Sequence, residues 1–393
     1  NENSFSIEAE FMTNQMKVLT VVGTRPEIIR LSRTMALLDQ YLNQIIVHTG
    51  QNYDYELNEI FWEQLELRKP DHFLNASTDS LGATIGDIFL KIEKVLLSEN
   101  PDAMLILGDT NSCLTAYMAK RMHIPVFHME AGNRSYDFNV PEEVNRRVVD
   151  HISDFNLVYT EHARRHLISE GLPHRRIYLT GSPMNEVLKY YLPKITDSNI
   201  LDSLSLNAKK YFLVSVHREE NVDNADNLKK IITILNTLVG EYDIPVIVST
   251  HPRTRKRIEA LDNYHIDDRI LFLKPFGFMD YVNLQINALC TISDSGTISE
   301  ESSILNFAAI SLRKSMERPE AQDTGAVILT GFKPEVVVNS VRMVIDEFDD
   351  NSHHLEIPAD YAIENTSWRV LKLIMGNAGL SNEWWGISEA YGG

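Results

Sequence analysis

The sequence predicts an α/β protein made of two Rossmann-like, doubly wound domains that face a cleft. Short runs rich in Val, Ile and Leu alternate with segments whose apolar residues recur at helical spacing. The alternation starts near residue 16 and restarts near residue 211, after a polar and poorly patterned segment. The 393 residues are also too many for one compact core. Alternating strands and helices favour parallel sheets covered by helices on both faces.

The expected elements follow this alternation along the chain. In the first half, strands are expected at 17–22, 44–48, 103–107, 124–127, 155–159 and 177–179, with helices after Pro26 and at 88–97, 114–122, 144–152 and 161–170. In the second half, strands are expected at 211–216, 244–249, 270–273, 289–292 and 308–312, with helices at 227–239 and 334–347. Pro26 and Pro141 suit the first turn of a helix, where proline costs no helical hydrogen bond.

These elements divide the chain into four segments. Residues 1–15 are polar and unpatterned, which indicates a disordered arm or an expression remnant. We expect 16–190 to form an N-terminal domain and 191–362 a C-terminal domain, with the polar segment 192–208 as the linker. Residues 363–393 are expected to pack back on the N-terminal domain.

Composition excludes several classes of protein. A net charge of −18 argues against a nucleic-acid partner, because the phosphate backbone would be repelled. No apolar stretch approaches the roughly 20 residues of a membrane span, and no signal peptide is evident. Cys113 and Cys290 lie in apolar runs, which favours buried free thiols and a reducing cytoplasm.

The stretch from His128 to Arg146 concentrates ionisable residues between an expected strand and an expected helix. Glu130, Glu142 and Glu143 all fall within it. Ligands of open α/β sheets bind at the carboxyl ends of the strands, and a helix start adds partial positive charge. The alternative is a solvated loop with a capping acid. Asp109, on Gly-Asp-Thr after another strand, is a further candidate acid, either an Mg²⁺ ligand or a loop-stabilising group.

A second group of candidates follows strands of the C-terminal half. In Ser-Asp-Ser-Gly-Thr-Ile-Ser-Glu-Glu, Ser295 and Gly296 offer hydroxyl and backbone donors for a diphosphate at a helix start. Glu300 or Glu301 is suited to accept both hydroxyls of a ribose. The alternative is an ordinary serine cap with a nearby glutamate. Arg318, in Glu-Arg-Pro-Glu after the last expected strand, is a further anion binder.

Cofactor motifs are lacking. The turn Gly-Thr-Arg-Pro-Glu at 23–27 lacks the G-x-G-x-x-G pattern, so bound NAD is not indicated. Arg25 and Arg30 there offer a second phosphate clamp, or are simply solvated. His217 and His251 both follow strands, and nothing in their spacing suggests zinc. Acids in one half and anion binders in the other are what a sugar-nucleotide enzyme needs.

Taken together, the motifs resemble those of the non-hydrolysing UDP-N-acetylglucosamine 2-epimerases. Gly-Thr-Arg-Pro-Glu, Gly-Asp-Thr, His-Met-Glu-Ala-Gly, Pro-Glu-Glu-Val-Asn-Arg, Val-His-Arg-Glu-Glu-Asn, Ser-Asp-Ser-Gly and Glu-Arg-Pro-Glu occur in the family's order, between about residues 16 and 362. The resemblance implies a glycosyltransferase-B-like fold, a homodimer, and inversion of C2 through elimination and re-addition of UDP. It implies no nicotinamide and no metal.

The resemblance also assigns residues. Asp109, Glu130 and Glu142 match the family's catalytic carboxylates and His217 its essential histidine, without settling which carboxylate is the base. The matches to substrate-binding positions are Arg25, Arg30, His217, His251, Ser295, Gly296 and Arg318, with Glu301 as the ribose acid and Tyr281 near uracil. Thr297 stands where many members have a second glycine, and Asn52 replaces a histidine of an activating UDP-GlcNAc site.

A narrower resemblance concerns the sugar. Asn133, where the UDP-GlcNAc enzymes usually have Leu, and Gly-Ser-Pro-Met at 181–184 resemble the branch that makes UDP-N-acetyl-L-fucosamine for surface polysaccharides. This branch epimerises UDP-2-acetamido-2,6-dideoxy-L-talose at C2. The alternatives are conversion of UDP-GlcNAc to UDP-ManNAc, a retaining glycosyltransferase on the same fold, and a non-catalytic sugar-nucleotide sensor.

Overall fold

The computed structural model describes residues 15–50, 61–77, 79–216, 224–250, 254, 257–258, 265–349 and 357–387. The chain forms two compact units. Unit 1 comprises residues 1–187 and 363–393, and unit 2 comprises residues 188–362. The boundary falls inside helix α8 (Met184–Thr196). Among the described residues, no helix combines the length and apolar character that crossing a membrane requires.

Unit 1 contains a seven-stranded parallel sheet in the order β3-β2-β1-β4-β5-β6-β7. Its strands are β1 (Lys17–Val22), β2 (Asn43–His48), β3 (His72–Phe73), β4 (Ala103–Leu107), β5 (Val126–Ala131), β6 (Phe155–Val158) and β7 (Ile177–Leu179). The central strands are buried on both faces, as expected for near-continuous apolar runs. The chain order reverses between β1 and β4, which defines a topological switch point.

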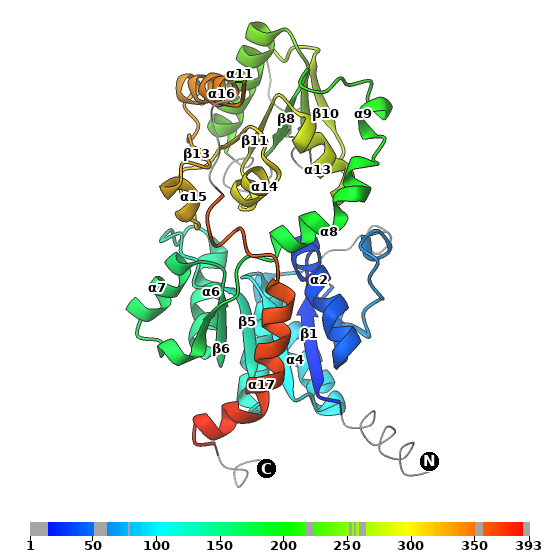
Figure 1. Cartoon of the computed structure of the whole chain (residues 1–393), viewed down its shortest axis with the longest axis vertical. Helices are drawn as coiled ribbons and strands as arrows, with labels where there is room; N and C mark the ends of the chain where they lie inside the picture. Colours follow the sequence, from blue (N-terminus) through cyan, green and yellow to red (C-terminus); the bar gives the residue numbers. More distant parts are fainter. Residues whose placement is uncertain are drawn as a thin grey trace. The chain divides into compact units, whose positions relative to one another are not determined.

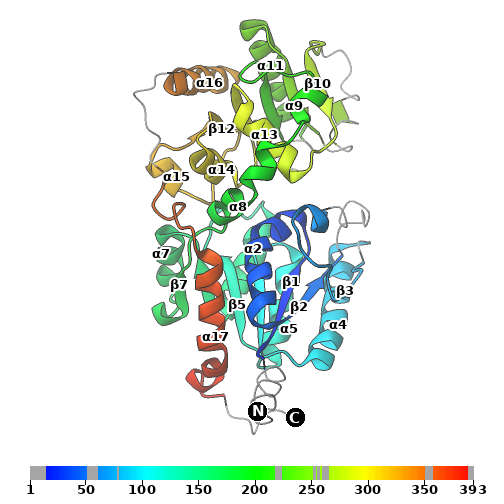
Figure 2. The same ribbon diagram turned by 45° about the vertical axis from the view of Figure 1, so that its right-hand side comes forward.

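Helices cover both faces of this sheet. One face carries α4 (Leu81–Glu99), the 3-10 turn η1 (Asn111–Leu114), α5 (Thr115–Arg121) and α6 (Pro141–Ile152), whose apolar side chains share one core with the strands. Helix α2 (Arg25–Tyr41) packs beside α17 (Thr366–Trp384), as Figures 1 and 2 show. Helix α7 (Glu161–Ser169) and the turn η2 (His174–Arg176) lie between β6 and β7 in the chain, and α7 packs on β7.

The C-terminal helix α17 is part of unit 1. The guanidinium of Arg176 donates to the hydroxyl of Ser381 at 3.0 Å and lies 3.9 Å from the ring centroid of Trp385. The indole Nε1 of Trp385 donates to Asp154 at 2.6 Å. Trp384, at 5.4 Å from the same guanidinium, and Trp385 therefore hold the end of α17 through cation–π and hydrogen-bonding contacts.

Unit 2 repeats the same topology. Its parallel sheet has six strands in the order β10-β9-β8-β11-β12-β13. The strands are β8 (Phe212–Ser215), β9 (Val246–Ser249), β10 (Ile270–Leu273), β11 (Cys290–Ser293), β12 (Ala309–Ser311) and β13 (Ile328–Leu329). Helices α11 (Ala225–Tyr242) and α16 (Pro334–Asp349) share the main core, and α13 (Phe278–Asn287) and α14 (Ile298–Leu305) contribute to other clusters. A short α15 (Glu320–Asp323) follows β12.

The structure confirms the fold class of two Rossmann-like units, each with a parallel sheet. Two local expectations were wrong. The segment 192–208, expected to be the linker, lies within unit 2 and contains the end of α8, which continues through Pro193 to Thr196, and α9 (Ile200–Ser203). Strand β5 does not end at residue 127 but continues to Ala131. The extension contains the polar residues His128 and Glu130, which interrupt the apolar run in the sequence, although His128 is completely buried.

Candidate functional site

In unit 1, the predicted acids gather at the carboxyl edge of the sheet, next to the switch point. Asp109 follows β4, Glu130 lies near the end of β5, and Glu142 occupies the first turn of α6. All three side chains are partly accessible to solvent, whereas the strands below them are buried. This edge is where ligands bind in open α/β sheets.

The carboxylate of Asp109 is held by an arginine of α6. Arg146 donates from Nε to Asp109 at 3.0 Å and forms a second, ion-paired contact through Nη2. The amide of Asn145 donates to the backbone carbonyl of Asp109 at 2.9 Å. Such two-point contact with a guanidinium orients a carboxylate and restricts its rotation. Helix α6 therefore holds both the side chain and the backbone of Asp109.

Glu130 has an unusual backbone. Its φ is 65°, and the register of β5 against β6 shifts between Met129 and Ala131, which marks a bulge. Left-handed geometry costs a non-glycine residue about 1–2 kcal/mol, and bulges beside active sites re-aim side chains. The carboxylate forms an ion pair with Arg30, and the amide of Asn133 lies 3.4 Å from it. The bulge thus turns Glu130 away from the core and toward these polar groups.

Glu143, the neighbour of Glu142, has a structural role. It is fully buried and accepts hydrogen bonds of 3.0 Å from the backbone and hydroxyl of Ser135, with Arg146 and Arg147 as ion-pair partners. Burial raises the pKa of Glu143, but the Ser135 amide and the charge of Arg146 outweigh it, so the net pKa is lowered. Of the adjacent acids, Glu143 braces the loop and Glu142 remains partly exposed.

Glu27 is a site-forming residue that its sequence motif did not single out. Its buried carboxylate accepts from the amide of Gly23 at 2.6 Å, the hydroxyl of Thr110 at 2.5 Å and the hydroxyl of Ser112 at 3.0 Å. Burial raises its pKa despite these hydrogen bonds. Glu27 therefore joins the loop after β1 to the loop after β4, directly at the switch point. The role of Glu27 could not be predicted from the sequence, because its partner Thr110 lies 83 residues away in the chain.

Arg25 begins helix α2 and is partly exposed, and Arg30 lies further along the same helix. Arg30 forms an ion pair with Glu130, so its guanidinium belongs to the group of predicted acids in unit 1.

In unit 2, Glu301, Tyr281 and Ser295 share one polar network at the ends of β8 and β11. The carboxylate of Glu301 accepts from the amide of Gln285 at 2.6 Å and from the hydroxyl of Thr297 at 2.7 Å. Ser295 and Thr297 share a hydrogen bond of 2.9 Å. Thr297, the departure from the family's glycine, thus connects the expected phosphate turn to the expected ribose acid.

The hydroxyl of Tyr281 shares hydrogen bonds with Ser215 and Ser293. Burial and the nearby charge of Glu301 raise the pKa of Tyr281, so this phenol is neutral. Open space surrounds the position that a Cβ of Gly296 would take, at the turn into α14. The backbone there is accessible to a ligand.

Arg318 lies deeper than expected of a simple phosphate contact. It is 4% exposed and forms an ion pair with the fully buried Glu300. Nearby, the hydroxyl of Tyr361 donates to Glu320 at 2.6 Å, and burial raises the pKa of Glu320. Glu300 therefore holds Arg318 in place, and Glu301 is the acid available to the Ser295 turn.

His217 and His251 lie outside the described residues, as does Asn52. Within the described part of the chain, no group of acidic, histidine or cysteine residues could hold a metal ion. Cys113 and Cys290 are buried free thiols, which confirms that prediction.

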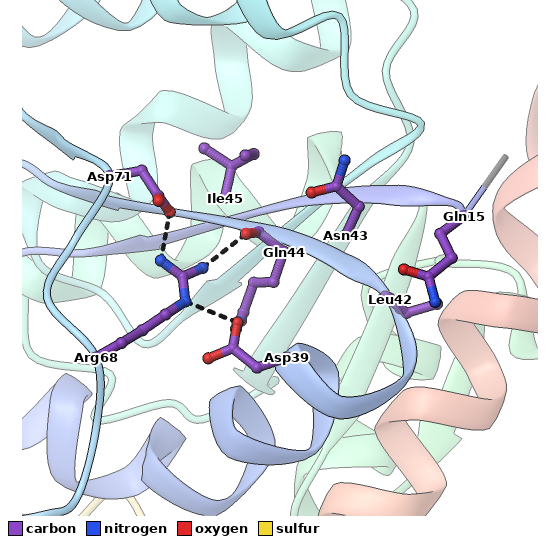
Figure 3. Close-up of a pocket in the computed structure, with 8 residues that line it drawn as sticks. All are labelled: Gln15, Asp39, Leu42, Asn43, Gln44, Ile45, Arg68 and Asp71. Atoms are coloured by element: carbon purple, nitrogen blue, oxygen red, sulfur yellow. Dashed lines mark hydrogen bonds and ion pairs between the residues drawn. The ribbon is translucent and has the colours of Figure 1, made fainter. Parts of the chain in front are cut away.

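A hollow of about 460 Å³ lies elsewhere in unit 1, at the opposite edge of the sheet near the start of β2. Figure 3 shows Arg68 among the lining residues, where it donates to Asp39 at 2.9 Å, to Asp71 at 2.7 Å and to the carbonyl of Gln44 at 2.6 Å. These polar groups satisfy one another, and the hollow contains none of the predicted site residues.

Comparison with known proteins places this geometry in a family. Residues 36–375 match the model of the UDP-N-acetylglucosamine 2-epimerase family. The structure of a UDP-N-acetylglucosamine 2-epimerase from Rickettsia bellii is 47% identical and superposes with a TM-score of 0.89 over 95% of this chain and 100% of that chain. The Methanocaldococcus jannaschii UDP-GlcNAc 2-epimerase, solved in complex with UDP-GlcNAc and UDP, is 34% identical with a TM-score of 0.84, covering 92% and 99% of the two chains.

A third relative differs in its sugar. The UDP-2,3-diacetamido-2,3-dideoxy-D-glucuronate 2-epimerase of Pseudomonas aeruginosa is 33% identical over 83% of this chain and 92% of its own length. The two units and their strand-end polar clusters thus define a sugar-nucleotide isomerase. The chain belongs to the UDP-N-acetylglucosamine 2-epimerase family and is a UDP-sugar 2-epimerase.

Proposed function

We propose that this enzyme converts UDP-2-acetamido-2,6-dideoxy-L-talose to UDP-N-acetyl-L-fucosamine for surface polysaccharide synthesis. The observation that carries the proposal is the position of Asn133, whose amide lies 3.4 Å from the carboxylate of Glu130. The UDP-GlcNAc enzymes that the sequence resembles usually have leucine there. An amide in place of an aliphatic side chain offers a donor and an acceptor beside a sugar-facing acid, which favours a differently configured sugar.

The second branch marker, Gly-Ser-Pro-Met at 181–184, supports the proposal less directly. Gly181 has a φ of 81°, and a Cβ there would approach Ile363 to within 2.6 Å. This motif is therefore required for packing against the segment before α17. Of the two markers, Asn133 is the one whose chemistry can affect which sugar binds, because its amide lies beside Glu130.

The reaction we propose inverts C2 in two steps. A carboxylate of unit 1 removes the C2 proton while the C1–O bond to UDP breaks, leaving a 2-acetamidoglycal and free UDP. UDP then adds back to C1 while a second group delivers a proton to the other face of C2. Asp109, Glu130 and Glu142 are the carboxylates we assign to these transfers, together with His217. A positioned base contributes about 10²–10⁴-fold.

The C2 proton is weakly acidic, so stabilisation of the departing diphosphate has to contribute strongly. We assign this task to Ser295, the backbone of Gly296 and Arg318 in unit 2, with Arg25 and His251 as further anion contacts. Glu301 and Tyr281 are assigned to the ribose and uracil. The chemistry needs neither a nicotinamide nor a metal.

A second candidate substrate is UDP-GlcNAc, with UDP-ManNAc as product. It is favoured by the relatives, because the Methanocaldococcus jannaschii enzyme was solved in complex with UDP-GlcNAc. A retaining glycosyltransferase or a non-catalytic sensor has no specific observation in its favour.

The test compares both substrates with purified enzyme by proton NMR. We expect product from the 6-deoxy-L-talo substrate at a kcat/KM at least about tenfold above that for UDP-GlcNAc. Asn133→Leu should lower the L-talo kcat/KM about 10–100-fold, as expected for loss of a polar contact to a substrate or its acid. Turnover of UDP-GlcNAc alone would reject the L-talo assignment, and accumulation of free UDP would indicate a hydrolysing enzyme.

We further propose that the enzyme is a cytoplasmic homodimer. Helix α4 exposes Leu90 and Leu97, which are 63% and 68% exposed and lie on one face because they are seven residues apart. Buried free thiols support a reducing compartment. Light scattering should give twice the mass of 44.9 kDa for the wild type and the monomer mass for Leu90→Glu/Leu97→Glu.

A further inference from the structure

We propose that His128 is a positioning residue that sets the direction of Asp109 through the backbone. His128 lies on β5, is completely buried and reaches no solvent-exposed group. Its Nε2 lies 2.8 Å from the carbonyl oxygen of Gly108, the residue that precedes Asp109. A carbonyl can only accept, so Nε2 carries the proton and donates it. The inference rests on the catalytic role proposed for Asp109.

The other side of the imidazole ring faces a buried carboxylate. Nδ1 of His128 lies 2.9 Å from a carboxylate oxygen of Asp150, which is fully buried on α6. The Asp150 carboxylate also accepts from Arg134 at 2.6 Å and from the backbone of Gly132 at 3.2 Å. Asp150 is thus anchored beside the ring, but Nδ1 of His128 forms no hydrogen bond, so among the described residues the carbonyl of Gly108 is the hydrogen-bonding partner of the imidazole.

The orientation of the Gly108–Asp109 peptide, whose carbonyl His128 binds, affects the position of Asp109. Gly108 has a φ of 77°, a left-handed geometry that turns the chain sharply between β4 and Asp109. Its amide donates to the carbonyl of Met129 at 3.0 Å, and a Cβ at this position would lie 3.5 Å from the carboxylate of Glu130. The turn therefore joins the two candidate acids, and a rotation of its carbonyl would move Asp109 relative to Glu130.

The three restraints on Asp109 differ in kind. Arg146 holds the carboxylate of Asp109, and Asn145 holds the backbone carbonyl of Asp109. His128 holds the preceding carbonyl and touches neither the carboxylate nor solvent. Loss of that bond should leave the substrate-binding groups intact but misplace the acid. Misplacement by about 1 Å can cost about 10²-fold in rate.

Two amide substitutions separate this role from general packing. The Gln side chain can place its NH₂ where Nε2 stands, whereas Asn reaches only the Nδ1 position. We expect His128→Gln to keep kcat within about threefold of the wild type, and His128→Asn to lower kcat about 10–100-fold with KM changed less than about twofold. Melting temperature and UDP binding by calorimetry show that both variants are folded.

Equal kcat values for the Gln and Asn variants, or a wild-type kcat for His128→Asn, would overturn the inference. The variant Asp109→Asn distinguishes failure of the His128 inference from failure of the proposed function. If Asp109→Asn is inactive and His128→Asn is fully active, only the role of His128 is rejected. A fully active Asp109→Asn rejects the role of Asp109 itself and with it the inference.

A neutron structure of the wild type gives an answer even if the variants fail to fold. Deuterium on His128 Nε2, directed at the Gly108 oxygen, is the expected result. A bare Nε2, or a ring turned away from Gly108, contradicts the proposal.

Discussion

Six strands follow the same order in both units, but the two units place different chemistry at the same point of the sheet. In unit 1 the loop after β4 carries Asp109, which an arginine of α6 orients. In unit 2 the equivalent loop after β11 carries Ser295, whose hydroxyl is linked to Glu301 through Thr297. Topology therefore determines where a ligand can bind, and the residues at the strand ends determine what is done to it.

The partners of the acids differ in the same way. Asp109 and Glu130 each face a guanidinium, from Arg146 and Arg30. Glu301 faces neutral donors, with the side chain of Gln285 at 2.6 Å. An acid held by cations is oriented and available for proton transfer in our proposal, whereas an acid held by an amide and a hydroxyl is suited to accept ligand hydroxyls. The following variants test this division.

The largest effect is expected at the end of β4. Asp109→Asn should lower kcat about 10²–10⁴-fold, because it removes a proton-transfer group from the reaction. UDP affinity should stay within about twofold, since the nucleotide contacts are assigned to unit 2. Asp102→Asn, at the other end of the same strand, is the matched control and should have nearly wild-type kcat. Loss of UDP binding in Asp109→Asn would contradict the division of roles.

The next effect concerns stability of unit 1. Ile374 on α17 is completely buried, so Ile374→Ala should lower the free energy of unfolding by about 2–5 kcal/mol in urea titrations. Met375→Ala, at the neighbouring and 52% exposed position, should change it by less than about 0.5 kcal/mol. Equal effects for the two variants would show that α17 is not a core element of unit 1.

Glu301 should affect binding rather than chemistry. Glu301→Ala removes a charged acceptor assigned to the ribose, and a hydrogen bond to a charged group contributes about 1.5–3 kcal/mol. Calorimetry should therefore show UDP bound about 10–100-fold more weakly, with kcat at saturating substrate within about threefold. The control is Glu335→Gln, an exposed acid of α16. A loss in kcat without a loss in affinity would place catalysis, not recognition, at Glu301.

The smallest effect is a pH dependence of unit 1. Hydrogen bonds from Arg134, opposed by burial, lower the pKa of Glu170 from 4.5 to about 2. A lowered carboxyl pKa stabilises the fold above the unfolded value near 4.5, and this stabilisation is lost as the pH falls toward 2. Because the side chain is partly exposed, we expect about 1–2 kcal/mol. Wild type and Glu170→Gln should differ by this amount at pH 7 and converge as the pH falls from about 4.5 toward 2.

The sequence was sufficient for features that depend on neighbouring residues. Alternation of apolar runs and helical spacing predicted the two parallel sheets, and Pro141 correctly marked the start of α6. Composition also predicted that Cys113 and Cys290 are buried and free. These features follow from local periodicity and hydrophobicity, which a single sequence displays directly.

Features that depend on distant partners could not be predicted. The tryptophan pair at 384–385 gains its role from Arg176, and the hydroxyl of Ser381 lies 205 residues from that arginine. The bulge at Glu130 was hidden because its polar residues resemble a loop, although they continue strand β5. In both cases tertiary contacts override the local pattern.

The most direct test of the central claim is exchange at C2 during turnover in D₂O. Proton NMR should show that the product of the wild-type enzyme, and with time the substrate pool, carries deuterium at C2, while UDP does not accumulate. The same experiment with Asp109→Asn should show exchange slowed in proportion to kcat. A product that keeps its original C2 proton would contradict the account, because proton removal by the unit 1 carboxylates would then not be part of the reaction.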